Sequence, residues 1–283
     1  MTGGHDPAPL RIVPRRHPGR WVAAAAAVLL LLALVRAFAQ GAIRWDVVGQ
    51  FLTAPAILAG LANTCVMTVS AMALGLALGV LFAVMALSPN PVLAWVARGY
   101  VWFFRGTPLL LQLLIWFNLA LVFPRLGVPG VLDWRTVDVI TPFMATLLGL
   151  GINQGAYTAE VVRAGIQSVD AGQVEAARSI GMTRLVLLRR VVLPQAMRVI
   201  IPPVGNEVVG MVKLTSVASV IQYAEVLHNA QTIYYANARV IELLIVAAFW
   251  YLAVVTVLNV GQAWLERAFA AGTRRAAKDE VRA

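Results

Sequence analysis

The sequence predicts an all-α polytopic membrane protein, a bundle of about six transmembrane helices of bilayer-crossing length. Hydrophobic residues occupy 60% of its 283 positions and charged residues only 13%, whereas about a quarter of the residues in an average soluble domain are charged. The apolar residues also occur in uninterrupted runs of about 20 residues, the length of a membrane-spanning helix. Arginines flank these runs without interleaved aromatic residues, so membrane topology explains the net charge of +10 better than nucleic-acid binding does.

The predicted spans together form one transmembrane domain at residues 21–266, with cytoplasmic tails at 1–20 and 267–283. The segment 40–59 is too polar for a span, so we expect it to lie at the membrane interface or to re-enter in part. The spans are residues 21–39, 60–87, 92–123, 140–164, 194–221 and 241–266.

The positive charges predict the orientation, because cytoplasmic loops of membrane proteins are enriched in lysine and arginine. With the N-terminus in the cytoplasm, most of the 23 lysine and arginine residues fall on the cytoplasmic side. We therefore predict a multi-pass protein of the cell (plasma) inner membrane with both termini cytoplasmic. The exceptions are Arg36, Arg44, Arg125, Arg135 and Arg239 outside and Lys213 within a span.

The longest predicted cytoplasmic connection, residues 165–193, carries helix signals of its own. Asp170 is a good N-cap, Gln173 follows three residues later, and Glu175 lies in the first turn. This arrangement predicts a helix that begins near Ala171.

Gly181 is predicted to end that helix with a sharp bend, because glycine adopts positive φ without strain. Residues 183–190 can then form a second short helix that leads to Pro194. Such an element can dock in a groove of a soluble partner or lie on anionic lipid, and the residues alone leave both alternatives open. The apolar side chains that we expect it to expose are Ala176, Ala177, Ile180, Met182 and Leu185.

The spacing within this loop favours the first alternative. Glu175-Ala176-Ala177 is followed by Gly181 and then by Val191-Val192-Leu193-Pro194. This pattern resembles the EAA motif of ABC-importer permeases, with valine where isoleucine is commoner. The resemblance implies coupling helices that sit on a separate ATPase subunit, with Glu175, Ala176, Ala177, Gly181 and Pro194 as the coupling residues.

The likeness runs from about Gly60 to Gln231 and is to polar amino-acid permeases of the histidine/glutamine type, which implies the fold of an ABC type I importer permease. This chain has Lys213-Leu214-Thr215-Ser216 where that family usually has Lys-Asp-Thr-Ser. The stretches that look alike are Gly60 to Thr64, Phe104 to Leu109, Tyr157 to Gly165, Gly172-Gln173 and Leu193 to Glu207.

The chain contains no G-x-x-x-x-G-K-[ST] phosphate loop, so we expect it to be a transport subunit and not an enzyme. We expect it to need no cofactor of its own, because the resemblance implies that a partner ATPase binds ATP and Mg²⁺. The resemblance also implies an extracytoplasmic solute-binding protein, a polar amino-acid substrate and a second permease subunit, either a copy or a paralogue. His5, His17 and His228 lack ligand-like spacing, so we assign no metal.

Polar residues within the spans are candidates for a substrate pathway, because ionisable groups at membrane depth usually line a pathway or pair with one another. In the fourth predicted span Asn153, Tyr157 and Glu160 lie on one helical face. Glu160 can instead form a structural pair with Arg163, three residues further on. We expect Arg105 to extend toward the cytoplasmic interface.

The fifth predicted span carries a second polar stripe. Asn206, Lys213 and Ser216 share one face, and Glu207 and Thr215 flank it. We hypothesise that the two stripes bind or pass the α-amino and α-carboxylate groups of a zwitterion, and a structural role for these residues stays open.

Two other classes of protein compete with the importer. A secondary transporter or channel would use an ion gradient and would not need the long amphipathic loop. A membrane enzyme would need a metal cluster or a nucleophile with its base at depth, and the sequence offers no such cluster.

Overall fold

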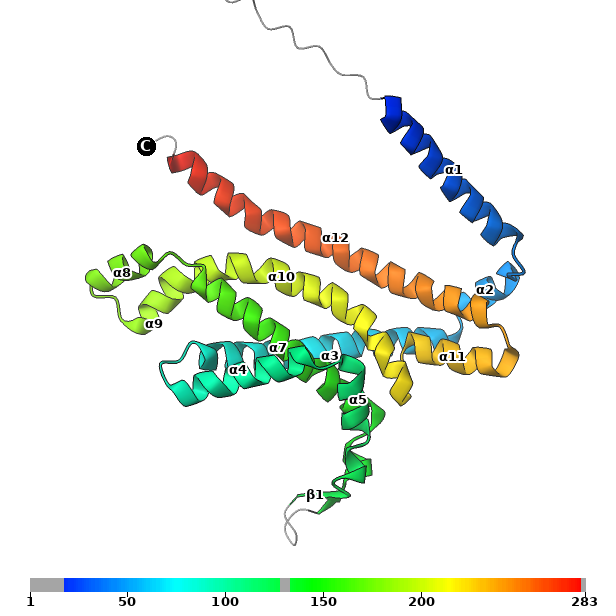
Figure 1. Ribbon diagram of the computed structural model, residues 1–283, viewed down its shortest axis with the longest axis horizontal. Coiled ribbons are helices and arrows are strands. Elements are labelled where there is room, and N and C mark those ends of the chain that lie inside the picture. The colour runs from blue at the N-terminus through cyan, green and yellow to red at the C-terminus, as the bar shows by residue number, and fades with distance from the viewer. Residues whose placement is uncertain (1–17, 128–132, 281–283) are drawn as a thin grey trace, which may run out of the picture. The chain divides into compact units, whose positions relative to one another are not determined.

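The computed structural model describes residues 18–127 and 133–280, which are mostly helical and divide into two units (Figure 1). The first unit, Met1–Trp45, contains α1 (Pro18–Gln40), whose side chains are exposed along its length. The second unit, Asp46–Ala283, contains the remaining elements. Residues 1–17 of the predicted N-terminal tail lie outside the described residues.

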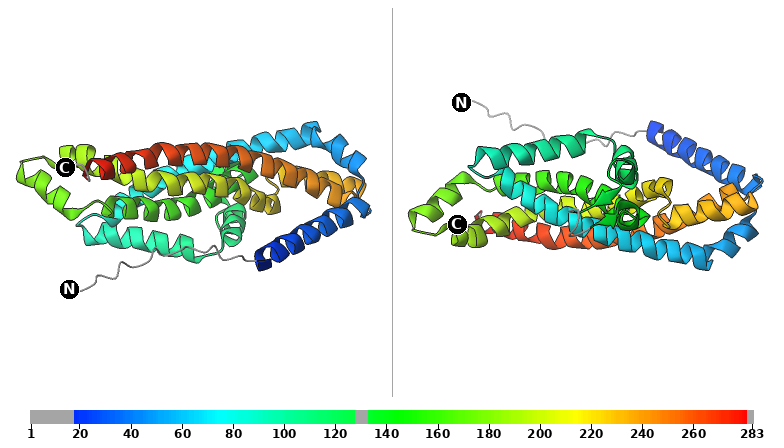
Figure 2. Two further views of the ribbon diagram at one scale, coloured as in Figure 1. Left: turned by 90° about the horizontal axis from the view of Figure 1, so that it is seen from above. Right: turned by 90° about the horizontal axis from the view of Figure 1, so that it is seen from below.

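The second unit is a bundle in which α10 packs against both α7 and α12 (Figures 1 and 2). Within this unit α8 and α9 lie at one end and α11 lies at the other. Its longer helices are α3 (Pro55–Ala86), α4 (Pro91–Gly106), α5 (Leu109–Phe117), α7 (Pro142–Gln167), α8 (Ala171–Ser179), α10 (Leu193–Leu214), α11 (Val226–Asn237) and α12 (Val240–Glu280).

The helical membrane bundle that the sequence predicts is confirmed, although not every predicted span is a single long apolar helix. Among the described residues, three helices are long and apolar enough to cross a membrane: Gly19–Gln40, Pro55–Ala86 and Val240–Arg267. A fourth span results if α4 and α5 count together. The predicted spans 140–164 and 194–221 correspond to α7 and to α10 with the 3₁₀ helix η3 (Thr215–Ile221), which carry more polar side chains.

The predicted span at 92–123 is broken into two helices, α4 and α5. The axes of α4 and α5 meet at 101°, and the break falls at Thr107 and Pro108. Proline has no backbone N–H to donate, and it disfavours helical geometry at the residue before it. Thr107 is accordingly extended, with φ −109° and ψ 144°.

The polar segment before α3 folds as the short helix α2 (Trp45–Leu52). Its residues Val48, Phe51 and Leu52 pack on the buried cluster that joins α11 and α12. Trp250 of α12 donates its indole N–H to the carbonyl of Leu52 at 2.8 Å. Helix α3 then begins at Pro55, where proline is well tolerated as the first residue of a helix.

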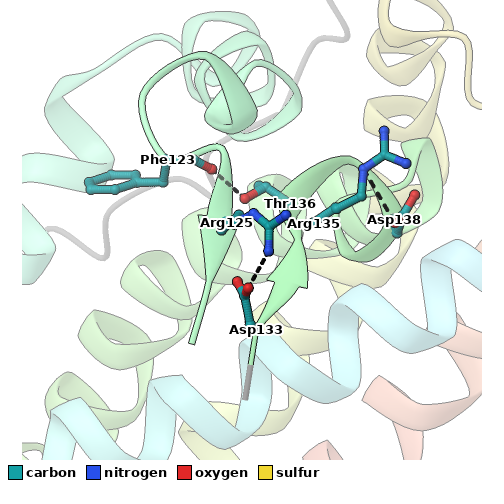
Figure 3. Close-up of polar contacts among 6 residues, drawn as sticks. All are labelled: Phe123, Arg125, Asp133, Arg135, Thr136 and Asp138. Atoms are coloured by element: carbon teal, nitrogen blue, oxygen red, sulfur yellow. Dashed lines mark hydrogen bonds and ion pairs between the residues drawn. The ribbon is translucent and has the colours of Figure 1, made fainter. Parts of the chain in front are cut away.

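A small hairpin connects α5 to α7 (Figure 3). After the 3₁₀ helix η1 (Leu119–Leu121), strands β1 (Arg125–Leu126) and β2 (Trp134–Arg135) pair antiparallel and lead into α6 (Thr136–Val139). The fully buried Thr136 donates its hydroxyl to the carbonyl of Phe123, and Arg125 pairs with Asp133. These contacts tie the two ends of the connection together.

Helix α7 lies very close to α3, because both helices carry glycine where they meet. A Cβ atom on Gly75 would lie 2.6 Å from Cγ of Gln154, and one on Gly79 would lie 2.6 Å from Cβ of Thr158. Gly151 of α7 meets α3 in the same way, since a Cβ atom there would lie 2.6 Å from Cδ2 of Leu74. Pairs of small residues commonly allow such close packing between helices in membrane proteins.

We predict that Gly79→Ala lowers the free energy of unfolding by about 1–3 kcal/mol, the usual cost of overpacking a close contact. Thermal melting of the purified protein in detergent measures the change. Gly99→Ala on α4 is the matched control, because no heavy atom lies within 4 Å of the Cβ position there. An equal loss of stability in both variants would contradict close packing at Gly79.

Candidate coupling loop and substrate cavity

The loop after α7 begins with the predicted helix cap. The side chain of Asp170 accepts a hydrogen bond from the backbone N–H of Gln173 at 3.1 Å, and α8 begins at Ala171. The cap satisfies one of the backbone donors that the first turn of a helix leaves without a partner. This local prediction is confirmed.

The bend and the second helix also follow the prediction, with one difference. Gly181 has φ +80°, a conformation that costs glycine little. Helix α9 (Arg184–Leu187) then passes through a π-helical segment, η2 (Leu188–Val192), directly into α10. No break separates the second helix from α10, because Pro194 occupies the first turn of α10, where its missing N–H is not needed.

The exposed surface of the loop differs from the prediction at Ala177 and Met182. Ala177 is only 5% exposed and packs with Leu187 and Val192 in the loop's own small core. Met182 is half-buried against the same core. The expectation that Ala177 lies on the docking surface is therefore wrong, because the α8–α9 fold needs an apolar contact of its own. The predicted surface residues Ala176, Ile180 and Leu185 are exposed, and so are Glu175 and Gly181.

The loop is fastened to α10 by polar and apolar contacts. The Gln195 side chain of α10 donates to the side-chain oxygen of Gln173 on α8 at 2.7 Å. Gly165, near the end of α7, leaves no room for a Cβ because Ile200 of α10 fills the space. Helices α7, α8 and α10 therefore contact one another around the loop.

A cavity of about 370 Å³ lies where α7 and α10 pass the bend between α4 and α5. Small-molecule sites are typically concave and mostly apolar with a few convergent polar groups, and this cavity has that character. Its lining residues are Thr107, Pro108, Leu109, Asn153, Gln154, Tyr157, Glu207, Gly210 and Leu214.

Glu207 is the acidic group of this cavity and is held at one of its two oxygens. Its Oε2 accepts hydrogen bonds from Gln154 Nε2 at 2.7 Å and from Thr158 Oγ1 at 2.9 Å. No described residue donates to its other oxygen, Oε1. Glu207 can thus receive a donor from a ligand without losing the bonds that orient it.

Asn153 and Gln112 hold the broken span in place. Asn153 donates to the carbonyl of Phe104 at 2.8 Å and to the side-chain oxygen of Gln112 at 3.2 Å. Gln112 in turn donates to the carbonyls of Phe104 and Thr107 at 3.0 and 3.1 Å. Backbone carbonyls that a broken helix leaves free must find donors at membrane depth. Two amide side chains meet that need here, and sequence reasoning missed Gln112.

Of the predicted pathway residues, the structure brings Asn153, Tyr157 and Glu207 together in the cavity. Glu160 instead pairs with Arg163, whose Nε lies 3.0 Å from its Oε2, as the structural alternative required. The Asn206 and Lys213 side chains are exposed outside the cavity.

The remaining two members of the predicted α10 stripe bond to nearby backbone. The Thr215 hydroxyl donates to the carbonyl of Val212 at 2.7 Å, and that of Ser216 donates to the carbonyl of Lys213 at 2.6 Å. The face of α10 that lines the cavity carries Glu207, Gly210 and Leu214. The predicted stripe therefore lies one residue away from the cavity-lining face, and Leu214, the departure from the family pattern, is part of the cavity wall.

Comparison with known proteins identifies the family. Residues 75–271 match the family described as the binding-protein-dependent transport system inner membrane component, and the chain belongs to that family. An arginine transport system permease protein of Corynebacterium glutamicum is 41% identical over 276 residues, covering 95% of this chain and 86% of that protein. An L-cystine transport system permease protein of Bacillus subtilis is 39% identical, covering 80% of this chain and 91% of that protein.

Solved structures show the same fold. A crystal structure of an amino acid ABC transporter with histidines superimposes with a TM-score of 0.67 at 36% identity, covering 76% of this chain and 94% of that chain. An inward-facing methionine ABC transporter superimposes with a TM-score of 0.60 at 17% identity, covering 76% and 96%, which is a likeness of fold alone.

We predict that Thr158→Val lowers substrate uptake by the assembled transporter about tenfold. The change keeps the shape of the side chain but removes one hydrogen bond to Glu207, and a bond to a charged group contributes about 1.5–3 kcal/mol. Initial uptake rates in proteoliposomes measure the effect. Thr146→Val is the matched control, since Thr146 is equally buried on α7 but donates to its own helix, at the carbonyl of Pro142. Equal uptake in the two variants would show that the orientation of Glu207 does not matter.

Proposed function

We propose that this chain is the permease subunit of an ATP-driven importer that translocates polar amino acids through the cavity at Glu207. The observation that carries the proposal is that one helix connects the loop with the cavity. Helix α10 begins at the candidate coupling loop, and its C-terminal part, from Glu207 to Leu214, lines the cavity. The family and the amino-acid transporters among the relatives support the same function.

The cavity favours substrates with a positively charged group. Glu207 offers a free carboxylate oxygen, and charge-assisted hydrogen bonds to a carboxylate are strong. Leu214 adds an apolar wall where the family usually has a second acid, so Glu207 is the single acidic group that lines the cavity. Relatives named for arginine, nopaline and octopine transport support an amino acid with such a group.

The proposal includes three protein partners. An ATPase subunit that binds ATP and Mg²⁺ would dock on the exposed part of the loop, around Glu175, Ala176 and Gly181. An extracytoplasmic solute-binding protein would deliver the amino acid, and a second permease subunit, a copy or a paralogue, would complete the pathway. The excess of arginine near the termini supports a cytoplasmic location for both ends of the chain.

We predict that proteoliposomes containing this chain, its ATPase subunit and its binding protein accumulate amino acids only when ATP is present. Uptake of radiolabelled amino acids with ATP, with a non-hydrolysable analogue and with an imposed ion gradient makes the comparison. Accumulation driven by the ion gradient without ATP would contradict the proposed function and favour a secondary transporter.

We predict that Gly181→Pro and Glu175→Lys leave the protein inserted but uncouple ATP hydrolysis from transport. Proline cannot adopt the φ of +80° found at Gly181, and it also removes the N–H that donates to the carbonyl of Arg178 at 2.9 Å. Glu175→Lys reverses an exposed charge on α8. The ratio of amino acid imported to ATP hydrolysed should fall about tenfold in each variant, a change equal to about 1.4 kcal/mol of coupling.

Asp138→Lys is the control for the charge reversal, because Asp138 is an exposed acid of α6, in the connection between α5 and α7. It should keep the wild-type ratio. Wild-type ratios in Gly181→Pro and Glu175→Lys would mean that the ATPase contacts another surface.

A further inference from the structure

Arg105 lies beside the cavity, although the sequence suggested only an interfacial role for it. Its guanidinium carbon is 5.1 Å from the centre of the Tyr157 ring, within the range of a cation–π contact. Tyr157 lines the cavity and is 42% exposed. Thr107, two residues after Arg105, lines the same cavity. Arg105 is not itself a lining residue, but its guanidinium rests against the ring of one, Tyr157.

Arg105 has no hydrogen-bond acceptor or ion-pair partner among the described residues. Glu160, one turn beyond Tyr157 on α7, is an acid close enough to feel the charge of Arg105. Both oxygens of Glu160 are bound by Arg163, through its Nε and Nη2 atoms. The guanidinium of Arg105 thus keeps its donors for another group.

The charges at the cavity have a complementary arrangement. The carboxylate of Glu207 comes from α10, and the guanidinium of Arg105 comes from α4 on the side of Tyr157. A planar guanidinium matches the two oxygens of a carboxylate in geometry and charge. An amino acid carries one carboxylate and at least one cationic group, so it can bind the guanidinium of Arg105 and the carboxylate of Glu207 at the same time.

From this arrangement we propose that Arg105 binds the α-carboxylate of the transported amino acid, with the ring of Tyr157 as its platform. The inference rests on the proposed function, because it assigns one more binding group to the same cavity. It makes Arg105 a residue that distinguishes amino acids from amines and amides of equal size. Glu207 then receives the cationic group.

The test is equilibrium binding to the purified complex of permease and ATPase in nanodiscs without binding protein, so that only the permease selects the ligand. The probes are L-arginine and L-argininamide, whose α-carboxylate is replaced by a neutral amide. The wild-type complex should bind L-arginine about tenfold more tightly than L-argininamide, as expected for one charge-assisted contact. Arg105→Gln should bind L-arginine about tenfold more weakly than wild type does and L-argininamide unchanged, which removes the preference.

Three further variants separate ligand binding from a loss of structure. Arg98→Gln makes the same change two turns earlier on α4, where Arg98 donates only to the carbonyl of Ala94, and should keep the preference. Tyr157→Phe keeps the aromatic platform and should keep the preference, whereas Tyr157→Leu removes the platform and should reduce it. If Arg105→Gln retains the wild-type preference, or weakens both ligands equally, Arg105 serves the fold or the lipid interface and the inference is wrong.

The outcome can be told apart from a failure of the proposed function. If the reconstituted transporter carries a different amino acid, that amino acid and its α-amide replace the arginine pair in the same comparison. A wild-type complex that neither binds nor transports any amino acid overturns both proposals. A complex that transports amino acids without any dependence on Arg105 overturns this inference alone.

Discussion

The cavity depends on the close approach of α3 and α7 at Gly75 and Gly79. Because these positions lack a side chain, Gln154 and Thr158 can sit against the backbone of α3 and still direct their polar atoms to Glu207. Small residues bring helices close in a membrane, where lipid tails provide little hydrophobic drive for association. The same contact that packs the bundle therefore orients the acid of the candidate site.

The bend between α4 and α5 supplies another wall of the cavity, through Thr107, Pro108 and Leu109. The free-energy cost of unsatisfied backbone groups at this bend explains the polar side chains around it. A break at membrane depth frees backbone carbonyls, and water is not present in the hydrocarbon to satisfy them. Asn153 and Gln112 donate to these carbonyls, which anchors the bend to α7. Asn153 is thus a structural residue whose side chain also faces the cavity, so its presence in a polar stripe does not by itself indicate substrate contact.

Features that depend only on residues close together in the sequence could be predicted from the sequence. Asp170 caps α8 and Gly181 bends the chain because both effects arise within one or two turns. The cavity-lining face of α10 could not be predicted, since the polar stripe through Asn206 and Lys213 and the face through Glu207 and Leu214 differ by one residue. Only the packing of α10 on α7 chooses between them. The same holds for Ala177, which tertiary contact buries although its motif suggested an exposed position.

The route from the candidate coupling loop to the cavity is short and made of continuous helix. Helix α9 passes through η2 into α10 without a turn, and the Gln173 and Gln195 side chains join α8 to the same helix. A displacement of α8 would therefore act on α10 directly, and α10 carries Glu207 against partners that belong to α7. Movement of α10 relative to α7 would stretch the bonds from Gln154 and Thr158 and change how Glu207 presents its free oxygen. Opening the cavity and weakening its hold on a cationic group would thus be one motion.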